Sequence, residues 1–191
     1  MSQDIIEKAK GFIMDPAAAF RNAHSDEMGE ALKYFAIILA INSVLSGLMV
    51  MVGLGASTSI PGMGVGVAGG IAVIIGNFIG GIIGLFVCGL IVHIFVALII
   101  GGNGIGQTIN AMIYGATPAM LFSWIPVIGI LAALWSLVLY IIGIRELHDT
   151  TTGKAAVAVL IPVVILIVLV IIALAALVAF FTISSGTFTA A

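Results

Sequence analysis

Long apolar runs, separated by short polar or glycine-rich breaks, dominate the pattern of this chain. The longest run covers residues 69–100 and contains no Asp, Glu, Lys, Arg or Pro. A helix of that length reaches ~45–50 Å and exceeds the ~30 Å hydrocarbon core of a bilayer, so it must tilt, bend or project beyond it. Similar runs at 31–54, 105–122, 127–147 and 155–183 predict four further spans. The prediction is an all-α membrane bundle of five transmembrane helices.

Small side chains recur at every fourth position within the run 69–100. Gly76, Gly80 and Gly84 therefore share one helix face. In lipid, such a stripe lets a second helix approach closely, and van der Waals contact then holds the pair. We therefore expect this helix to be the central one, against which the other spans pack. We expect the neighbour on the stripe to belong to the same chain, and a homo-oligomer is the alternative.

Residues 2–14 have the periodicity of an amphipathic helix. Ile5, Ile6, Phe12 and Ile13 share one face, and charged residues occupy most of the other. This pattern predicts a helix that lies in the membrane interface, with lipids as its partner and with a wedge-like effect on curvature. A helix packed on the protein's own cytosolic surface is the alternative.

Local signals predict where helices begin and end. Asp15 before Pro16 predicts an N-cap with proline in the first turn. Ser25, followed by two acidic residues, predicts the cap of the next helix. Pro162 predicts a kink or an early break in the last span. Residues 55–66 combine Gly, Ser and Pro without any charge, which predicts a loop.

These elements divide the chain into a cytosolic helical arm (1–30), a transmembrane domain (31–183) and a polar tail (184–191). The composition is 62% hydrophobic and 7% charged, with a mean hydropathy of +1.36. Soluble domains carry about a quarter charged residues, so the chain is an integral membrane protein. Its net charge of -2 argues against a nucleic-acid partner, and its single cysteine, Cys88, excludes an intrachain disulfide.

Charged residues are confined to two segments, residues 4–33 and 145–154. Both contain Lys and Arg, which prefer the cytoplasmic side of a membrane. An even number of spans must then separate them, and the four predicted there satisfy this condition. The fifth span sends the C-terminus to the opposite side. In a prokaryote the membrane would be the cell membrane.

Few polar side chains lie within the predicted spans. We expect His93 to be a neutral imidazole that is hydrogen-bonded between helices rather than a proton-sensitive or ligand-binding group. The same holds for the carboxamides, which we expect to bond between helices rather than to line a substrate path: Asn42, Asn77, Gln107 and Asn110.

Catalytic and metal-binding patterns receive no support from the sequence. His148 lies near two acidic residues but has no second histidine or cysteine in its segment, so we expect no metal site. No serine or cysteine has a base and an orienting acid beside it. We therefore expect neither enzymatic activity nor a cofactor.

Several segments, taken in their order and spacing, resemble the Yip family (the Ypt-interacting protein family of five-span membrane proteins). A Tyr-Gly-Ala-Thr-Pro motif lies in the third span, an Ile-Arg-Glu-Leu-His motif closes the fourth, and Thr-Gly-Lys-Ala opens the fifth. The residues of these motifs that we take as candidates for family-specific interaction are Tyr114, Pro118, Arg145, Glu146, Gly153 and Lys154.

The resemblance implies five spans, a cytoplasmic N-terminus and a C-terminus on the opposite side. In eukaryotic relatives it implies a role in vesicle traffic between endoplasmic reticulum and Golgi, with binding of prenylated Rab-type GTPases. The cytosolic arm of this chain, about thirty residues, is much shorter than the arm of those proteins and matches a prokaryotic-type short form.

Two functional hypotheses follow. The first is a non-enzymatic membrane scaffold or adaptor that meets a protein partner at a small cytosolic face and organises membranes in a trafficking-like role. The second is a small channel or carrier for a neutral or weakly polar solute. A hydrated cavity that reaches His93 and Asn77 would favour the second hypothesis, and a solid core there would favour the first.

Overall fold

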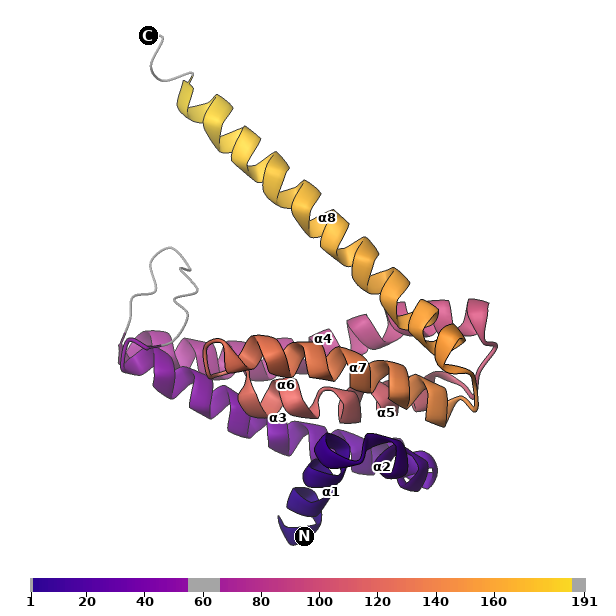
Figure 1. Ribbon diagram of the computed structural model, residues 1–191. Coiled ribbons are helices and arrows are strands. Elements are labelled where there is room, and N and C mark those ends of the chain that lie inside the picture. Colours follow the sequence, from indigo (N-terminus) through magenta and orange to yellow (C-terminus); the bar gives the residue numbers. More distant parts are fainter. Residues whose placement is uncertain (1, 55–65, 187–191) are drawn as a thin grey trace.

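A computed structural model of the protein describes residues 2–54 and 66–186, and these residues form helices and turns. The elements are α1 (Ser2–Met14), α2 (Pro16–Asn22), η1 (Ala23–Ser25), α3 (Met28–Met51), α4 (Val67–Ile99), α5 (Ile105–Gly115), α6 (Thr117–Phe122), α7 (Ile128–Leu147) and α8 (Thr152–Gly186). Figure 1 shows α3 to α7 side by side in one bundle, with α1 and α2 on one side of it. Most of the loop predicted over 55–66, and the end of the polar tail, lie outside the described residues.

Four helices, α3, α4, α7 and α8, have the length and hydropathy of membrane spans. The third predicted span is instead two short helices, α5 and α6, that follow one another. Pro118 causes the interruption because it has no N–H to give to the carbonyl of Tyr114. The Thr117 hydroxyl donates to that carbonyl instead, at 2.7 Å. The break is therefore compensated within the chain.

The most enclosed element is α5, not the long helix α4. Every residue from 108 to 115 is buried, because α3, α4 and α7 all pack around this helix. In contrast, α4 exposes a large apolar residue at nearly every turn, including Ile75, Ile79 and Ile83. The bundle is thus organised around a short helix that carries polar residues, not around the most hydrophobic one.

The glycines that make close helix contacts are not those of the predicted stripe. A Cβ placed on Gly76, Gly80 or Gly84 would meet nothing within 4 Å, so the expected packing of this stripe within the chain is not found. A Cβ on Gly70 would lie 2.7 Å from the Gly47 carbonyl oxygen of α3.

Gly81 approaches α3 in the same way, because a Cβ there would lie 2.7 Å from Leu39 Cδ1. Eleven residues, about three helical turns, separate Gly81 from Gly70, which places both on the face of α4 that contacts α3. The fourfold spacing of the predicted stripe marked a different face of the same helix.

The first span begins without the predicted serine cap. Ser25 ends the short helix η1, and Glu27 occupies the N-cap position of α3 with no side-chain bond to the helix. The prediction for Asp15 is confirmed, because its carboxylate accepts a hydrogen bond from the Ala18 N–H at 3.3 Å at the start of α2. Proline in the first turn of α2 is confirmed as well.

The last helix is continuous through Pro162, so the predicted early break is not found. Its first turns pack against the bundle through Ala155, Ala158, Val159 and the proline itself. From residue 164 to residue 183 every side chain is exposed. Figure 1 shows α8 leaving the bundle obliquely after this anchored start.

The connection between α6 and α7 is short and strained. Val127 has φ 69° and ψ −53°, and the Ile128 N–H donates to the Pro126 carbonyl at 2.8 Å. This is a γ-turn of the rare positive-φ kind, which a β-branched residue adopts at a steric cost. In Figure 1 the α6–α7 turn stops short of the far ends of α3 and α4.

We expect matched alanine substitutions on α4 to have opposite effects. Gly70→Ala should lower the free energy of unfolding by about 1–3 kcal/mol, because its Cβ meets backbone of α3. Gly80→Ala should raise it by up to about 1 kcal/mol, because alanine favours the helix and the space is open. Thermal unfolding of both variants in detergent checks this, and shifts of equal sign and size would contradict the α3–α4 contact.

Candidate functional site

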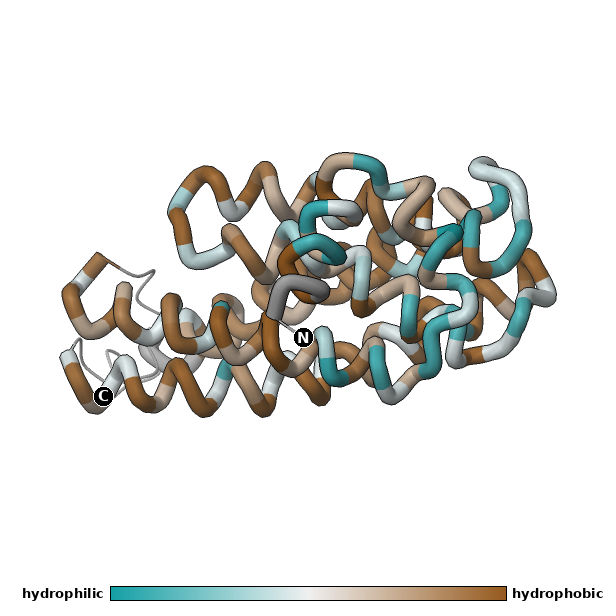
Figure 2. Tube along the Cα trace, turned by 90° about the horizontal axis from the view of Figure 1, so that it is seen from below, coloured by the Kyte–Doolittle hydropathy of each residue, from teal (hydrophilic) through white to brown (hydrophobic). Residues whose placement is uncertain are grey.

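The two charged segments of the sequence lie at one end of the bundle, together with the turn between α4 and α5. We call this region, residues 5–33, 101–107 and 145–154, the charged end. Gln107 Nε2 donates to the His24 carbonyl at 3.1 Å, and Asn103 Nδ2 donates to Asp149 Oδ2 at 3.1 Å. These bonds join three segments that are far apart in sequence. Figure 2 shows hydrophilic residues gathered towards this end, while hydrophobic residues dominate the rest.

An aromatic cluster fixes the N-terminal arm to the bundle. Phe12 is fully buried and stacks on Tyr114, with ring centroids 4.5 Å apart and an interplanar angle of 13°. Phe20 and Tyr34 complete the cluster, at 4.9 and 6.4 Å from the Phe12 ring. Aromatic pairs at these separations contribute beyond their buried area.

The position of Phe12 favours the second interpretation of α1, a helix packed on the protein itself. The other apolar residues of the predicted interfacial face are less enclosed: Ile5 and Ile13 are partly buried, and Ile6 is 68% exposed. The largest side chain of that face therefore cannot act as a membrane wedge, because it lies in the protein core.

Asp26 ties the arm to α5. Its Oδ2 atom accepts from Lys8 Nζ and from the Tyr114 hydroxyl, both at 2.5 Å. The Lys8 ammonium group also lies 4.8 Å from the centroid of the Tyr114 ring, within range of a cation–π interaction. Asn110 Nδ2 donates to the Asp26 backbone carbonyl at 3.1 Å. This carboxylate therefore holds α1 and α5 together rather than capping a helix.

A chain of hydrogen bonds connects two histidines at the base of α4. The Asn103 N–H donates to His148 Nδ1 at 2.8 Å, so the proton of this neutral ring is on Nε2. His148 Nε2 lies 3.0 Å from Thr108 Oγ1, and that hydroxyl lies 2.9 Å from His93 Nδ1. Thr108 Oγ1 therefore accepts from His148 Nε2 and is also hydrogen-bonded to His93 Nδ1, which connects α5 to α4.

Burial lowers the pKa of His148 from 6.5 to about 4, and the nearby His93 adds to this effect while Asp149 opposes it. His148 is only 4% exposed, although it follows directly after α7. The neutral form is therefore the one that fits this site at physiological pH.

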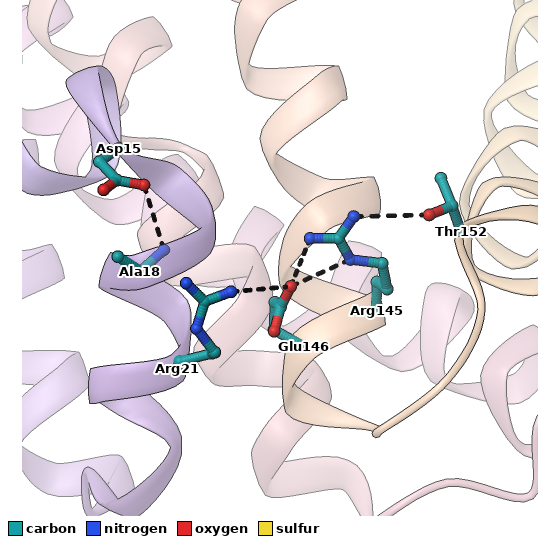
Figure 3. A network of polar contacts seen from close by, with 6 residues as sticks. All are labelled: Asp15, Ala18, Arg21, Arg145, Glu146 and Thr152. Atoms are coloured by element: carbon teal, nitrogen blue, oxygen red, sulfur yellow. Dashed lines mark hydrogen bonds and ion pairs between the residues drawn. The ribbon is translucent and has the colours of Figure 1, made fainter.

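The family-motif residues at the end of α7 form a network with the arm (Figure 3). Glu146 Oε1 accepts from the Arg145 guanidinium, with Nε at 3.0 Å, and lies 3.7 Å from Arg21 Nη1. Arg145 Nη1 reaches Thr152 Oγ1 at 3.5 Å, which connects α7 to the start of α8. One carboxylate therefore joins α2 and α7.

The remaining motif residues have different environments. Tyr114 and Pro118 are buried, the first under the arm and the second at the start of α6. Gly153 and Lys154 are exposed in the first turn of α8. The six motif residues therefore do not form one continuous surface. Arg145, Glu146 and Lys154 nevertheless all lie at the charged end.

At the end of the bundle opposite the charged end, the carboxamides of Asn42 and Asn77 differ in their hydrogen bonding. Asn42 Nδ2 donates to the Met120 carbonyl at 2.6 Å and to Ser123 Oγ at 2.8 Å, as expected of a bond between helices. Asn77 has no hydrogen-bond partner among the described residues, contrary to expectation. Both line a cavity of about 540 Å³ between α3, α4 and the α6–α7 turn.

Sequence reasoning singled out neither Asp26 as a tie between helices nor this cavity. The only sequence signal for Asp26 was its acidic character near a helix start, which predicted a local role. Lys8 and Tyr114 are 18 and 88 positions away from it, and no periodicity connects them.

Comparison with known protein families finds a match over nearly the whole chain. The family described as Yip1 domain matches residues 10–188. No curated protein and no solved structure matches the chain.

We expect Phe12→Ala to lower the free energy of unfolding by about 3 kcal/mol, because it removes a fully buried ring. The matched control Ile6→Ala, on the same helix but exposed, should change it by less than about 0.5 kcal/mol. Thermal unfolding of both variants in the same detergent checks this. An unchanged midpoint for Phe12→Ala, together with weaker membrane binding, would instead support an interfacial helix.

We also expect stability to fall on acidification through His148. Because its folded pKa of about 4 lies below the unfolded value of 6.5, its contribution is complete above pH 6.5 and is lost as the pH falls towards 4. The loss should reach about 2 kcal/mol near pH 4.5. Melting temperatures of the wild type and His148→Gln across this range check it, and parallel curves for the two proteins would contradict the prediction.

Proposed function

Because the chain belongs to the Yip1 domain family, we propose that it is a non-enzymatic membrane scaffold or adaptor that acts through its charged end. The observation that carries this proposal is the collection of the charged segments, 4–33 and 145–154, at one end of an apolar bundle. That end is the part of the protein best suited to meet a soluble partner, because the rest of the surface is hydrophobic.

We infer that the charged end faces the cytoplasm, because every Lys and Arg of the sequence lies in two of its segments, 5–33 and 145–154. We infer further that α5 and α6 together make the third of five membrane passes. Their 18 residues span ~27 Å if helical, close to the thickness of the hydrocarbon core. On this inference the C-terminus lies on the opposite side of the membrane.

A groove between α1 and α2 supports the choice of partner surface. It has a volume of about 470 Å³, and charged residues of both signs line it, among them Glu7, Lys8 and Asp15. Lys10 and Lys154 are exposed at the same end. A mixed-charge groove on folded helices suits a protein segment with complementary charges.

A carrier for a neutral solute is the alternative, and the cavity at Asn77 is the observation that favours it. Against it, the cavity does not reach His93, whose Nδ1 is bonded to Thr108. The fully buried stretch 108–115 lies between the cavity and the charged end. This packing supports a scaffold over a path across the bundle.

Photo-crosslinking in intact cells tests the proposal. A photoreactive residue at Lys10 should give a discrete product with another protein, and Lys154→Glu should reduce the yield at least severalfold by reversing another charge of the charged end. The same residue placed at Leu54, exposed at the far end of α3, is the matched control and should give no such product. Equal yields from both positions would contradict the proposal, and solute flux through purified vesicles would favour the carrier.

A further inference from the structure

The cavity at the far end of the bundle has defined walls. It lies between α3 and α4 and is bounded on one side by the α6–α7 turn. Gly81 and Leu39, which are in close contact, both line it. The α6–α7 turn stops short of the ends of α3 and α4 (Figure 1), and the cavity lies beside this turn.

Uncharged polar groups concentrate in this cavity. Among the described residues, the Asn77 carboxamide and the Ser46 hydroxyl, both in its wall, have no hydrogen-bond partner. Asn42 uses both of its N–H groups on Met120 and Ser123, which leaves its carbonyl oxygen available. Ser123 accepts from Asn42 and therefore retains its own hydroxyl proton for donation.

The Asn77 side chain is exposed, so a molecule from outside the chain can reach it. In apolar surroundings an unpaired amide costs free energy, so a ligand that supplies its hydrogen bonds is stabilised there. The described residues that line the cavity include no Asp, Glu, Lys or Arg, so none of them would balance a charged ligand. A suitable ligand is therefore neutral and able both to donate and to accept hydrogen bonds. A ligand that carries several adjacent hydroxyl groups meets both conditions.

The level of the cavity points to the membrane interface. Trp124 is part of its wall, and its Nε1 donates to the Leu121 carbonyl at 2.8 Å. Tryptophan in membrane proteins concentrates at the headgroup level, where one side of the ring is apolar and the other is wet. The long helix α4, with 33 residues, can project beyond the hydrocarbon at this end.

We propose that this cavity binds an uncharged, hydroxyl-rich group, the glycosyl or glycerol headgroup of a neutral lipid or the same group free in solution. Asn77 and Ser46 donate to and accept from its hydroxyls, and the carbonyl oxygen of Asn42 accepts a further hydrogen bond. The Trp124 ring provides an apolar wall. This binding is independent of any partner at the charged end.

Tryptophan fluorescence tests the proposal directly. The chain has two tryptophans, so in a Trp135→Phe background Trp124 is the reporter. The protein is reconstituted in phosphatidylcholine vesicles with increasing fractions of a monohexosyl diacylglycerol, or is titrated in pure phosphatidylcholine vesicles with free hexose or glycerol. We expect a saturable shift of Trp124 emission with the glycolipid. Asn77→Leu should raise the half-saturating fraction about tenfold by removing hydrogen bonds to the ligand.

Two serines on α3 provide the matched control. Ser46→Ala, in the cavity wall, should weaken the response, and Ser43→Ala should leave it unchanged. Ser43 is 1% exposed, lies outside the cavity and donates to the Leu39 carbonyl of its own helix at 2.8 Å. A response to the glycolipid alone assigns the site to a lipid headgroup, and a response to free hexose or glycerol as well assigns it to the hydroxylated group itself.

Other outcomes would overturn the proposal. No shift with any of these ligands, or one that is the same in Asn77→Leu, would mean that water alone fills the cavity. The oligomeric state in detergent provides a second measurement. If Asn77→Leu dissociates an oligomer and no ligand changes the emission, the open face of α4 with Gly76 and Gly80 is an interface between copies of the chain instead.

Discussion

The exclusion of unpaired polar groups from hydrocarbon is the constraint on which this structure depends. The chain meets it by confining charge to the charged end and by giving partners to Thr108 and to the Asn110 Nδ2 group of the buried helix α5, although Asn110 Oδ1 has no partner among the described residues. Pro118 has no N–H to donate to the Tyr114 carbonyl, and the Thr117 hydroxyl donates the hydrogen bond to this carbonyl instead. A short helix with polar side chains can therefore occupy the centre of the bundle.

The charged end works as one folded unit rather than as a set of loops. Asp26 joins α1 to α5, Glu146 joins α2 to α7, and Asn103 joins the α4–α5 turn to the end of α7. Each tie crosses between segments that are distant in sequence, so the loss of one would loosen several. A surface that is rigid in this way loses little conformational entropy when a partner binds to it.

The sequence predicted the helical class and four of its five spans correctly, because both depend on local composition and periodicity. It predicted packing poorly, since packing depends on which face of a helix meets which neighbour. The fourfold glycine stripe is a stronger pattern than the pair Gly70 and Gly81, yet this pair makes the contact with α3. Phe12 carried the periodicity of a membrane-interface helix, and only the position of Tyr114 reveals that its ring belongs to the core. Asn77 departed from the expectation for a similar reason, because it is exposed and no described side chain pairs with it.

The oblique course of α8 has a consequence for how the protein sits in bilayers of different thickness. This helix has 35 residues, or ~52 Å, against a hydrocarbon core of ~30 Å, and only its first turns are held by the bundle. Hydrophobic mismatch is relieved by tilt at a modest free-energy cost. Because every side chain from 164 to 183 is exposed, α8 can adjust its tilt while α3 to α7 keep their contacts. Helix α8 thus gives the protein a tolerance for membrane thickness that a fully packed bundle of this size would lack.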